Sequence, residues 1–369
     1  PEFSGEWKMC TIGELITKVG SGVTPRGGEA VYKTEGHPFV RSQNVGLGNL
    51  LLDDIAFIDE ETHLRQKNTE LQFNDVLLNI TGASIGRSAL VDKQIVGGNV
   101  NQHVCIIRTK ENLVPSFICS FLLSNYGQRQ IDSFQAGGNR QGLNFEQIKS
   151  IKITIPSKDE QIKIAKLLRA IDERIATQNK IIEKLQSLIK GLRVCCMQRN
   201  GSNNVYLSEI AQIYQPQTIS SAELTEDGFL VYGANGIIGK YKDYNHKTEQ
   251  ICITCRGNTC GMVNYTKPMS WITGNAMVIN TDKYQDKVYK KYLYHYLSAY
   301  NFNSIISGSG QPQIVRTPLE KLKITLPTIS EQKQKAMILD KVQDKIEINH
   351  NILNLYILQK QYLLRQMFI

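Results

Sequence analysis

The sequence repeats itself after about half of its length, and this repeat limits the folds that the chain can adopt. The hexapeptide Ile-Lys-Ile-Thr-Ile-Pro at 151–156 recurs as Leu-Lys-Ile-Thr-Leu-Pro at 322–327, with an offset of 171 residues. Glu160-Gln161 recurs as Glu331-Gln332 at the same offset. Because a repeat of this kind marks a duplicated structural unit, two related domains are expected. A length of 369 residues suits that number of domains.

Upstream of these blocks the two copies match more loosely but in the same order. Glu14 and Gly86 are 72 residues apart, whereas the matching Glu209 and Gly261 are only 52 apart. The first copy is therefore expected to carry an insertion. The matched segments are 12–15 with 207–210, 82–86 with 257–261, and Asn101 with Asn275.

Each copy has the pattern of short strands, loops and one helix. Residues 151–155 alternate apolar and polar side chains and end at Pro156, which cannot donate a backbone hydrogen bond to a strand ladder. Helices are expected at 115–126 and at the matching 289–300. Each globular domain is therefore predicted to mix α and β structure.

A long helix is predicted after each proline. Apolar residues from Leu168 to Leu192 follow alternating spacings of three and four, as in the seam of a coiled coil. The same positions plus 171 run from Leu339 to Leu363, with Lys360 as the clear departure. A helix over 161–194 would be about 50 Å long. The alternative is that each helix packs only on its own domain.

These patterns predict an α+β fold class. Two mixed α/β domains would be joined by two long helices that form an antiparallel coiled coil, and the internal repeat would give pseudo-twofold symmetry. The expected boundaries are 1–155 for the first domain, 156–198 for its helix, 199–326 for the second domain and 327–369 for the second helix.

Composition limits the kind of partner that the chain is expected to bind and the compartment in which it is expected to work. Lys plus Arg number 43 against 34 Asp plus Glu, and the net charge of +9 favours polyanionic partners. No apolar run reaches the roughly 18 residues of a membrane span. Eight cysteines, two of them adjacent at 195 and 196, do not form the pattern of a secreted disulfide framework. A soluble protein of the reducing cytoplasm is expected.

Three motifs suggest catalytic or metal chemistry, and each has a simpler interpretation. Residues 82–86 fit the G-x-S-x-G elbow of hydrolases, but a strand is predicted after them where that elbow needs a helix, so a glycine turn is favoured. Residues 233–240 approach a phosphate-binding loop but lack the Ser or Thr that holds magnesium, so a plain loop is expected. Cys252, Cys255 and Cys260 lack an evident fourth ligand for zinc, and a strand at 252–254 is expected instead.

Glycine-rich loops in each copy concentrate side chains that can read DNA bases. Arginine matches the two acceptors of guanine, and Asn or Gln match adenine. Turn chemistry also uses Gly and Asn, so a structural role remains the alternative for each residue. The candidates are Arg26, Arg41, Gln43, Asn44, Ser84, Arg87, Asn101, Gln102, His103, Arg140, Gln141 and Asn144 in the first copy, and Tyr232, Asn235, Arg256, Asn258, Thr259, Asn275, Gln311, Gln313 and Arg316 in the second.

The chain resembles the specificity subunit of type I restriction-modification enzymes. The resemblance rests on the opening segment at 6–15, on the two blocks that run from Pro to Glu-Gln, and on the long helix after each block. It implies two target-recognition domains that each read half of a split, asymmetric DNA sequence, with an antiparallel helical spacer between them. Two methyltransferase subunits would dock beside the spacer, and restriction subunits would join the larger complex.

The resemblance also implies that this chain is not catalytic. It contains no N-P-P-F or D-P-P-Y tetrapeptide of an adenine methyltransferase and no Walker A loop. S-adenosylmethionine, ATP and Mg²⁺ would therefore be used by the partner subunits. Two other classes stay open from the sequence: a recognition module of a solitary DNA methyltransferase, and a coiled-coil scaffold that joins proteins without binding DNA.

The first testable prediction concerns two amide side chains, one in the seam of each long helix. Gln178 and Asn349 occupy equivalent positions near the middle of each helix, so an antiparallel pair would bring them face to face. Replacing both with Leu should raise thermal stability and loosen the register of the helices. Thermal unfolding of both single variants and the double variant should show non-additive changes in stability. Strict additivity would contradict a contact between the two amides.

Overall fold

A computed structural model describes residues 6–135, 142–197, 203–234, 236–308 and 310–368. The chain divides into two compact units, one made of 1–178 with 352–369 and the other of 179–351. We describe each unit by itself. Among the residues described, no helix is long and apolar enough to cross a membrane.

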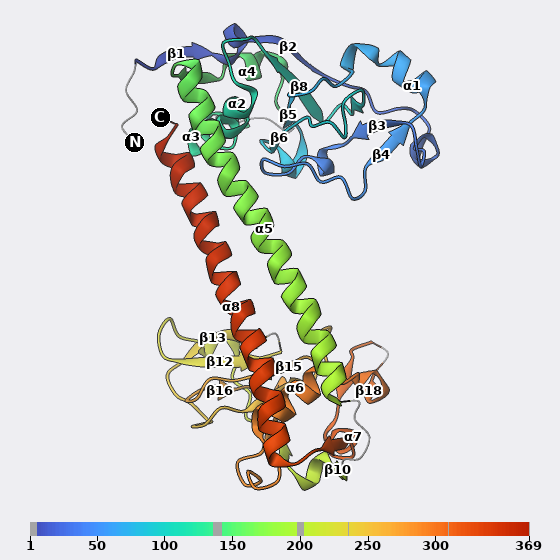
Figure 1. The fold of residues 1–369 in the computed structure, drawn as a ribbon, viewed down its shortest axis with the longest axis vertical. Coiled ribbons are helices and arrows are strands. Elements are labelled where there is room, and N and C mark those ends of the chain that lie inside the picture. The colour runs from blue at the N-terminus through green and yellow to red at the C-terminus, as the bar shows by residue number, and fades with distance from the viewer. Residues whose placement is uncertain (1–5, 136–141, 198–202, 235, 309, 369) are drawn as a thin grey trace. The chain divides into compact units, whose positions relative to one another are not determined.

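The described residues of unit 1 form three small sheets, and strands of each are labelled in Figure 1. The largest is antiparallel, with strands in the order β2-β8-β5-β6. In the second sheet, with order β4-β3-β7, strand β3 pairs with β7 in parallel. The third is the antiparallel pair β1 and β9. The bounds are β1 Lys8–Thr11, β2 Ile16–Ser21, β3 His37–Val40, β4 Ala56–Ile58, β5 Val76–Asn79, β6 Ser88–Leu90, β7 Asn99–Val100, β8 Val104–Thr109 and β9 Lys152–Ile155.

Helices α2, α3 and α4 of unit 1 pack in one core with the largest sheet. Phe117 and Phe121 of α2 are fully buried in one core with strands β5 and β8. The helix predicted at 115–126 is in fact two helices, because the Ser124 hydroxyl caps α3 by accepting a hydrogen bond from the Gly127 N–H at 3.1 Å. The helices are α1 Glu60–Arg65, α2 Pro115–Leu122, α3 Asn125–Ser133 and α4 Phe145–Ser150.

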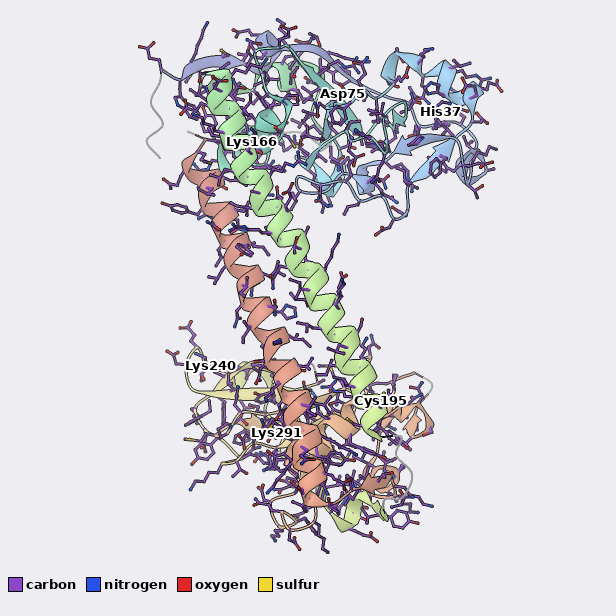
Figure 2. The ribbon with its side chains drawn as sticks, in the orientation of Figure 1. His37, Asp75, Lys166, Cys195, Lys240 and Lys291 are labelled. Atoms are coloured by element: carbon purple, nitrogen blue, oxygen red, sulfur yellow. The ribbon has the colours of Figure 1, made fainter. Side chains whose placement is uncertain are left out.

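One ion pair is built into the same sheet. Asp75, marked in Figure 2, is almost fully buried and accepts two hydrogen bonds of 2.7 Å from the Arg108 guanidinium on β8. The Asp75 side chain also accepts the backbone N–H of Gln72. A buried carboxylate is tolerated only with such partners, so the pair fixes the start of β5 against β8.

Unit 2 repeats these three sheets and adds the antiparallel pair β18 and β19. The orders are β11-β17-β14-β15, β13-β12-β16 and β10-β20, and the pair β12 and β16 is again parallel. The bounds are β10 Asn203–Tyr206, β11 Gln212–Tyr214, β12 Phe229–Gly233, β13 Gly236–Tyr241, β14 Ile251–Thr254, β15 Val263–Tyr265, β16 Trp271–Ile272, β17 Ala276–Asn280, β18 Ile306–Ser307, β19 Gln313–Ile314 and β20 Lys323–Leu326, with helices α6 Lys290–Ala299 and α7 Arg316–Glu320.

The structure confirms the duplication and corrects two details of it. The plain loop expected at 233–240 is wrong, because β12 and β13 form an antiparallel hairpin there. The match of Asn101 with Asn275 is also wrong. The Asn275 carbonyl accepts from the N–H of Cys255 just as the His103 carbonyl accepts from the N–H of Ile80, so His103 is the true counterpart. The first copy carries α1 as part of its expected extra length.

The two long helices are α5, Lys158–Met197, and α8, Ile329–Gln366. In unit 1, Leu168 of α5 packs in one cluster with Leu363 of α8, and Lys360 pairs with Asp172 at 2.6 Å. The seam's charged residue, Lys360, is thus paired with a carboxylate whose side chain is 42% exposed. In unit 2, one cluster joins residues 185, 189, 192 and 196 of α5 with residues 339, 342 and 346 of α8. Higher numbers on one helix meet lower numbers on the other, so each segment is antiparallel.

The helices also pack on their own domains, so the alternative expectation holds in part. Leu168 belongs to the core of unit 1, and Ala336 of α8 belongs to the core of unit 2. Gln178 lies in one unit and Asn349 in the other, and their pairing stays a prediction. The boundaries expected from the sequence likewise stay a prediction.

A buried glutamine attaches each long helix to its domain. The Gln161 amide accepts the N–H of Val114 at 2.9 Å and donates to the carbonyls of Asn112 and Pro156, both at 3.1 Å. Val114 is the residue that precedes α2, so one side chain ties together the domain helix, the end of β9 and the start of α5.

Gln332 makes the same three contacts in unit 2. It accepts the N–H of Tyr289 at 2.7 Å and donates to Lys287 and Pro327 at 3.2 and 2.9 Å. Both glutamines are 1% exposed. This is the physical reason why the Glu-Gln block recurs at the same distance from proline in the two copies.

Removing either glutamine should destabilise its unit. Gln161→Ala or Gln332→Ala leaves three backbone groups without their partner, and we expect a loss of about 3 kcal/mol in the free energy of unfolding. Gln186→Ala, an exposed glutamine on α5, is the matched control and should change stability by less than about 0.5 kcal/mol. Denaturant unfolding measures both. Equal, small effects would show that the buried contacts are dispensable.

Candidate nucleic-acid interface

Four segments of unit 1 meet at the residues that follow β5. The backbone N–H of Ile80 donates to His103, and the Ile80 carbonyl accepts from Leu143. The next residue, Thr81, forms a β-bridge with Gly142 and hydrogen-bonds through its hydroxyl to His103 Nδ1 at 2.5 Å. The 101–103 segment, the loop before α4 and the glycine turn at 82–86 are thereby held side by side.

The same arrangement occurs in unit 2 with different residues. The N–H of Cys255 donates to Asn275, and the Cys255 carbonyl accepts from Ile314. The next residue, Arg256, forms a β-bridge with Gln313. Because the contacts run through backbone atoms, they recur although the side chains around them differ.

The fourth segment is the loop after β3 or β12, and a polar strut connects it to the glycine turn. In unit 1, Asn79 Nδ2 donates to the Ser42 carbonyl at 2.8 Å and to the Ser84 hydroxyl at 3.1 Å. In unit 2, the hydroxyls of Thr254 and Thr259 both donate to the Ala234 carbonyl. We use "polar strut" for these two sets of residues.

The glycine turns are hairpin turns and not catalytic elbows. Residues 82–86 connect the antiparallel strands β5 and β6, and residues 257–261 connect β14 and β15. No helix follows directly, and the Ser84 hydroxyl is occupied by Asn79. The interpretation as a glycine turn is therefore confirmed.

The sequence candidates of unit 1 divide into exposed and internal residues. Asn44 is fully buried and its amide donates to Leu51 and Asp54, which makes it a loop-holding residue. Asn101 is also buried, and its side chain accepts the N–H of His103. Arg41 hydrogen-bonds to the Asp54 carbonyl at 2.9 Å. The side chains open to solvent are Arg26, Gln43, Arg87, Gln102 and Asn144, with Ser84 and His103 half-buried.

The candidates of unit 2 gather around a concave surface. Arg256, Gln313 and Arg316 line a cavity of about 370 Å³. Tyr232 is buried and its hydroxyl accepts from the N–H of Lys267, so it has an internal role. The remaining candidates are Asn258, Asn275 and Gln311, which are exposed, and Thr259, which is half-buried. Arg140, Gln141 and Asn235 lie outside the described residues.

The structure adds residues that sequence reasoning missed. Thr81 sits at the centre of the unit 1 surface, and Tyr214 and Met277 line the unit 2 cavity. The hydroxyl of Tyr214 lies 2.8 Å from His246 Nε2, and burial lowers the pKa of His246. Because His246 Nδ1 lies 2.5 Å from the acceptor Asn245 Oδ1, Nδ1 carries the proton of the neutral ring and Nε2 accepts from Tyr214. Thr81 precedes the glycine turn directly, and that adjacency was the available signal.

Cys252 and Cys255 of unit 2 are buried thiols. Cys252 and Thr254 lie on β14 as expected, and burial raises the pKa of Cys252 to about 12. Burial raises the pKa of Cys255 as well. Within the part of the chain that the structure describes, no group of three or more His, Cys, Asp or Glu could hold a metal ion.

Comparison with known proteins finds the same duplication of the chain. The family described as "Type I restriction modification DNA specificity domain" matches residues 4–187 and again 200–355. The chain belongs to this family. As a specificity subunit, it determines the DNA sequence on which a type I restriction-modification complex acts, and the two matched domains fit a two-part target.

Individual relatives support the assignment. The type I restriction enzyme MjaVIII specificity subunit of Methanocaldococcus jannaschii is 25% identical over 396 residues, covering 93% of this chain and 87% of that protein. The EcoprrI specificity subunit of Escherichia coli is 32% identical over 140 residues, 37% of this chain and 34% of that protein. The fold resembles the S subunit structure from M. genitalium, with a TM-score of 0.68, 17% identity, and coverage of 100% and 97% of the two chains.

Arg256 offers a direct test of the surface in the specificity subunit. A lost base contact relaxes preference at one base pair by about 1–3 kcal/mol, whereas a lost phosphate contact weakens all sequences and lowers the salt slope by about one. We expect Arg256→Ala to relax the preference at one base pair, because Arg256 is exposed and forms the β-bridge with Gln313.

Binding of the assembled complex to single-base variants at several salt concentrations measures this effect. Lys323→Ala removes an equal charge from an exposed side chain outside the four segments and is the control. Uniform weakening by Arg256→Ala would make Arg256 a phosphate anchor. An unchanged affinity would move the DNA-binding face elsewhere.

Proposed function

We propose that each unit reads one half of an asymmetric DNA target through the four joined segments. The observation that carries the proposal is that the same backbone frame brings these segments together twice, at Ile80 and at Cys255. Around the two frames the side chains differ, with the exposed Gln102 and the half-buried His103 in unit 1 and the exposed Arg256 and Gln313 in unit 2. Equal frames with unequal side chains suit two readers of different base sequences.

The loop glutamines, asparagines and arginines would supply base contacts, and the net charge of +9 would favour the phosphate backbone. In unit 1 we assign base contact to Gln43, Gln102 and His103. In unit 2 we assign it to Arg256, Gln313 and Arg316. The buried Asn44, Asn101 and Tyr232 would act by holding their loops in place.

The assembly in which this reading is used is also part of the proposal. Two methyltransferase subunits would dock on this chain, and restriction subunits would join them. This chain would remain non-catalytic, and the methylation and ATP-dependent cleavage would occur on those partners with S-adenosylmethionine, ATP and Mg²⁺. The compartment would be the cytoplasm.

Exchanging one recognition unit tests independent reading. Residues 199–320 are replaced by the same unit of a related specificity subunit, and the methylated sequence of host DNA is mapped after expression with the methyltransferase subunits. Because the two frames are separate, only one half of the target should change. The reciprocal exchange of residues 1–155 is the control and should change the other half.

Two outcomes would contradict the proposal. A change in both halves after a single exchange would show that the units do not read independently. Absence of sequence-selective binding by the complex of the original chain would favour a coiled-coil scaffold that joins proteins without DNA. If the chain were instead the recognition module of a solitary methyltransferase, its DNA target would not have two separable halves.

A further inference from the structure

We propose that Asn79 and Thr254 are positioning residues for base recognition, although neither faces solvent. Each lies at the end of a central strand. Asn79 donates to both the loop after β3 and the glycine turn, whereas Thr254 donates to the loop carbonyl of Ala234, to which Thr259 of the glycine turn also donates. The inference rests on the proposed function of the four segments. It names side chains that set the geometry of the readers and do not themselves touch DNA.

Burial and chemistry make these two positions unusual. Both side chains are completely buried, and the strand residues before them, Leu78 and Ile253, are buried apolar side chains. An amide or hydroxyl in such a place costs free energy unless it is hydrogen-bonded. An aliphatic side chain would serve core packing equally well, so the polar group has a separate task. That task is visible in its hydrogen bonds.

The two units solve the same task with different residues. Asn79 and Thr254 are equivalent, because both pair with the first residue of the neighbouring strand, Val104 in β8 and Ala276 in β17. Asn79 uses an amide and donates to the carbonyl of Ser42, two residues after the end of β3. Thr254 uses a hydroxyl and donates to the carbonyl of Ala234, one residue after the end of β12. The repeated feature is therefore the contact and not the residue type.

The strut joins two sheets at the point where DNA-reading side chains leave them. β5 and β14 belong to the four-stranded sheets, whereas β3 and β12 belong to the three-stranded ones. Gln43 follows the bonded Ser42 directly, and the turn on the other side of the strut leads to Arg87. A reading surface must hold its side chains within about 0.5 Å of the productive geometry. Loss of the strut would let the two segments shift against each other.

In unit 1 the hydrogen bonds of the polar strut are donated by the amide nitrogen of Asn79. Asn79 Oδ1 is buried and makes no hydrogen bond among the described residues, while Nδ2 makes two. In unit 2 the Ala234 carbonyl keeps a second donor, Thr259, if Thr254 loses its hydroxyl. A Thr254→Val variant should therefore fold, since it keeps the shape of a residue that suits a strand.

The experiment compares isosteric variants in the complete complex with its methyltransferase subunits. For Thr254→Val we expect discrimination against single-base variants of the half-site read by unit 2 to fall about fivefold, with the other half-site unchanged. Thr254→Ser keeps the hydroxyl and should restore discrimination. Asn79→Leu, which replaces the amide by an apolar group of similar shape, should act in the same way on the half-site of unit 1 only.

Thr266→Val is the matched control for the loss of a buried hydroxyl. Thr266 is 1% exposed and accepts the N–H of Gln250 at the other end of β14. The Thr266→Val variant should lower the stability of the protein and leave its base preference intact. A Thr254→Val complex that keeps full discrimination, or loses affinity equally for all sequences, would overturn the positioning role. If the original complex shows no sequence preference, the proposed function fails before the strut is tested.

Discussion

The buried glutamine at the start of each long helix is the contact on which the architecture of each unit depends. One side chain fixes three backbone segments that are far apart in sequence, as Gln161 does with Asn112, Val114 and Pro156. A helix of 40 residues is about 60 Å long, so a small change of angle at its first turn becomes a large displacement at its far end. A rigid amide with both an acceptor and donors limits that angle better than apolar packing can.

In the four joined segments, backbone atoms make most of the connecting contacts, and the exposed side chains are left to vary. The four segments are joined mainly by main-chain hydrogen bonds and bridges around Ile80 and Cys255. Main-chain contacts do not depend on residue type, so the exposed positions around them are free to differ between the copies. The fully buried polar residues, such as Asn44 and Asn79, are the exceptions, because their side chains take over the joining role.

The sequence revealed what depends on periodicity and repetition, and it failed where long-range contacts decide. The long helices, the strand at 151–155 and the duplication follow from local patterns, and the structure contains all three. The polarity of Asn44 and Tyr232 suggested DNA contact, but burial is a tertiary property and both side chains bond internally. The hairpin at 229–241 was missed because Gly and Asn occur in hairpin turns as well as in loops. The counterpart of Asn275 could be found only from hydrogen bonds.

The paired glycines of the hairpin turns also set where this chain can change over evolutionary time. Gly82 and Gly86 have φ angles of 71° and 85°, and Gly257 and Gly261 have 87° and 92°. Other residues are strained in this conformation, so the two ends of each turn are closed to most substitutions. Of the residues between the glycines, Ala83 and Asn258 are exposed, whereas Ser84 and Thr259 belong to the polar strut. Within each turn, the exposed position between the glycines can therefore change its side chain without disturbing the fold, while the strut residue beside it cannot.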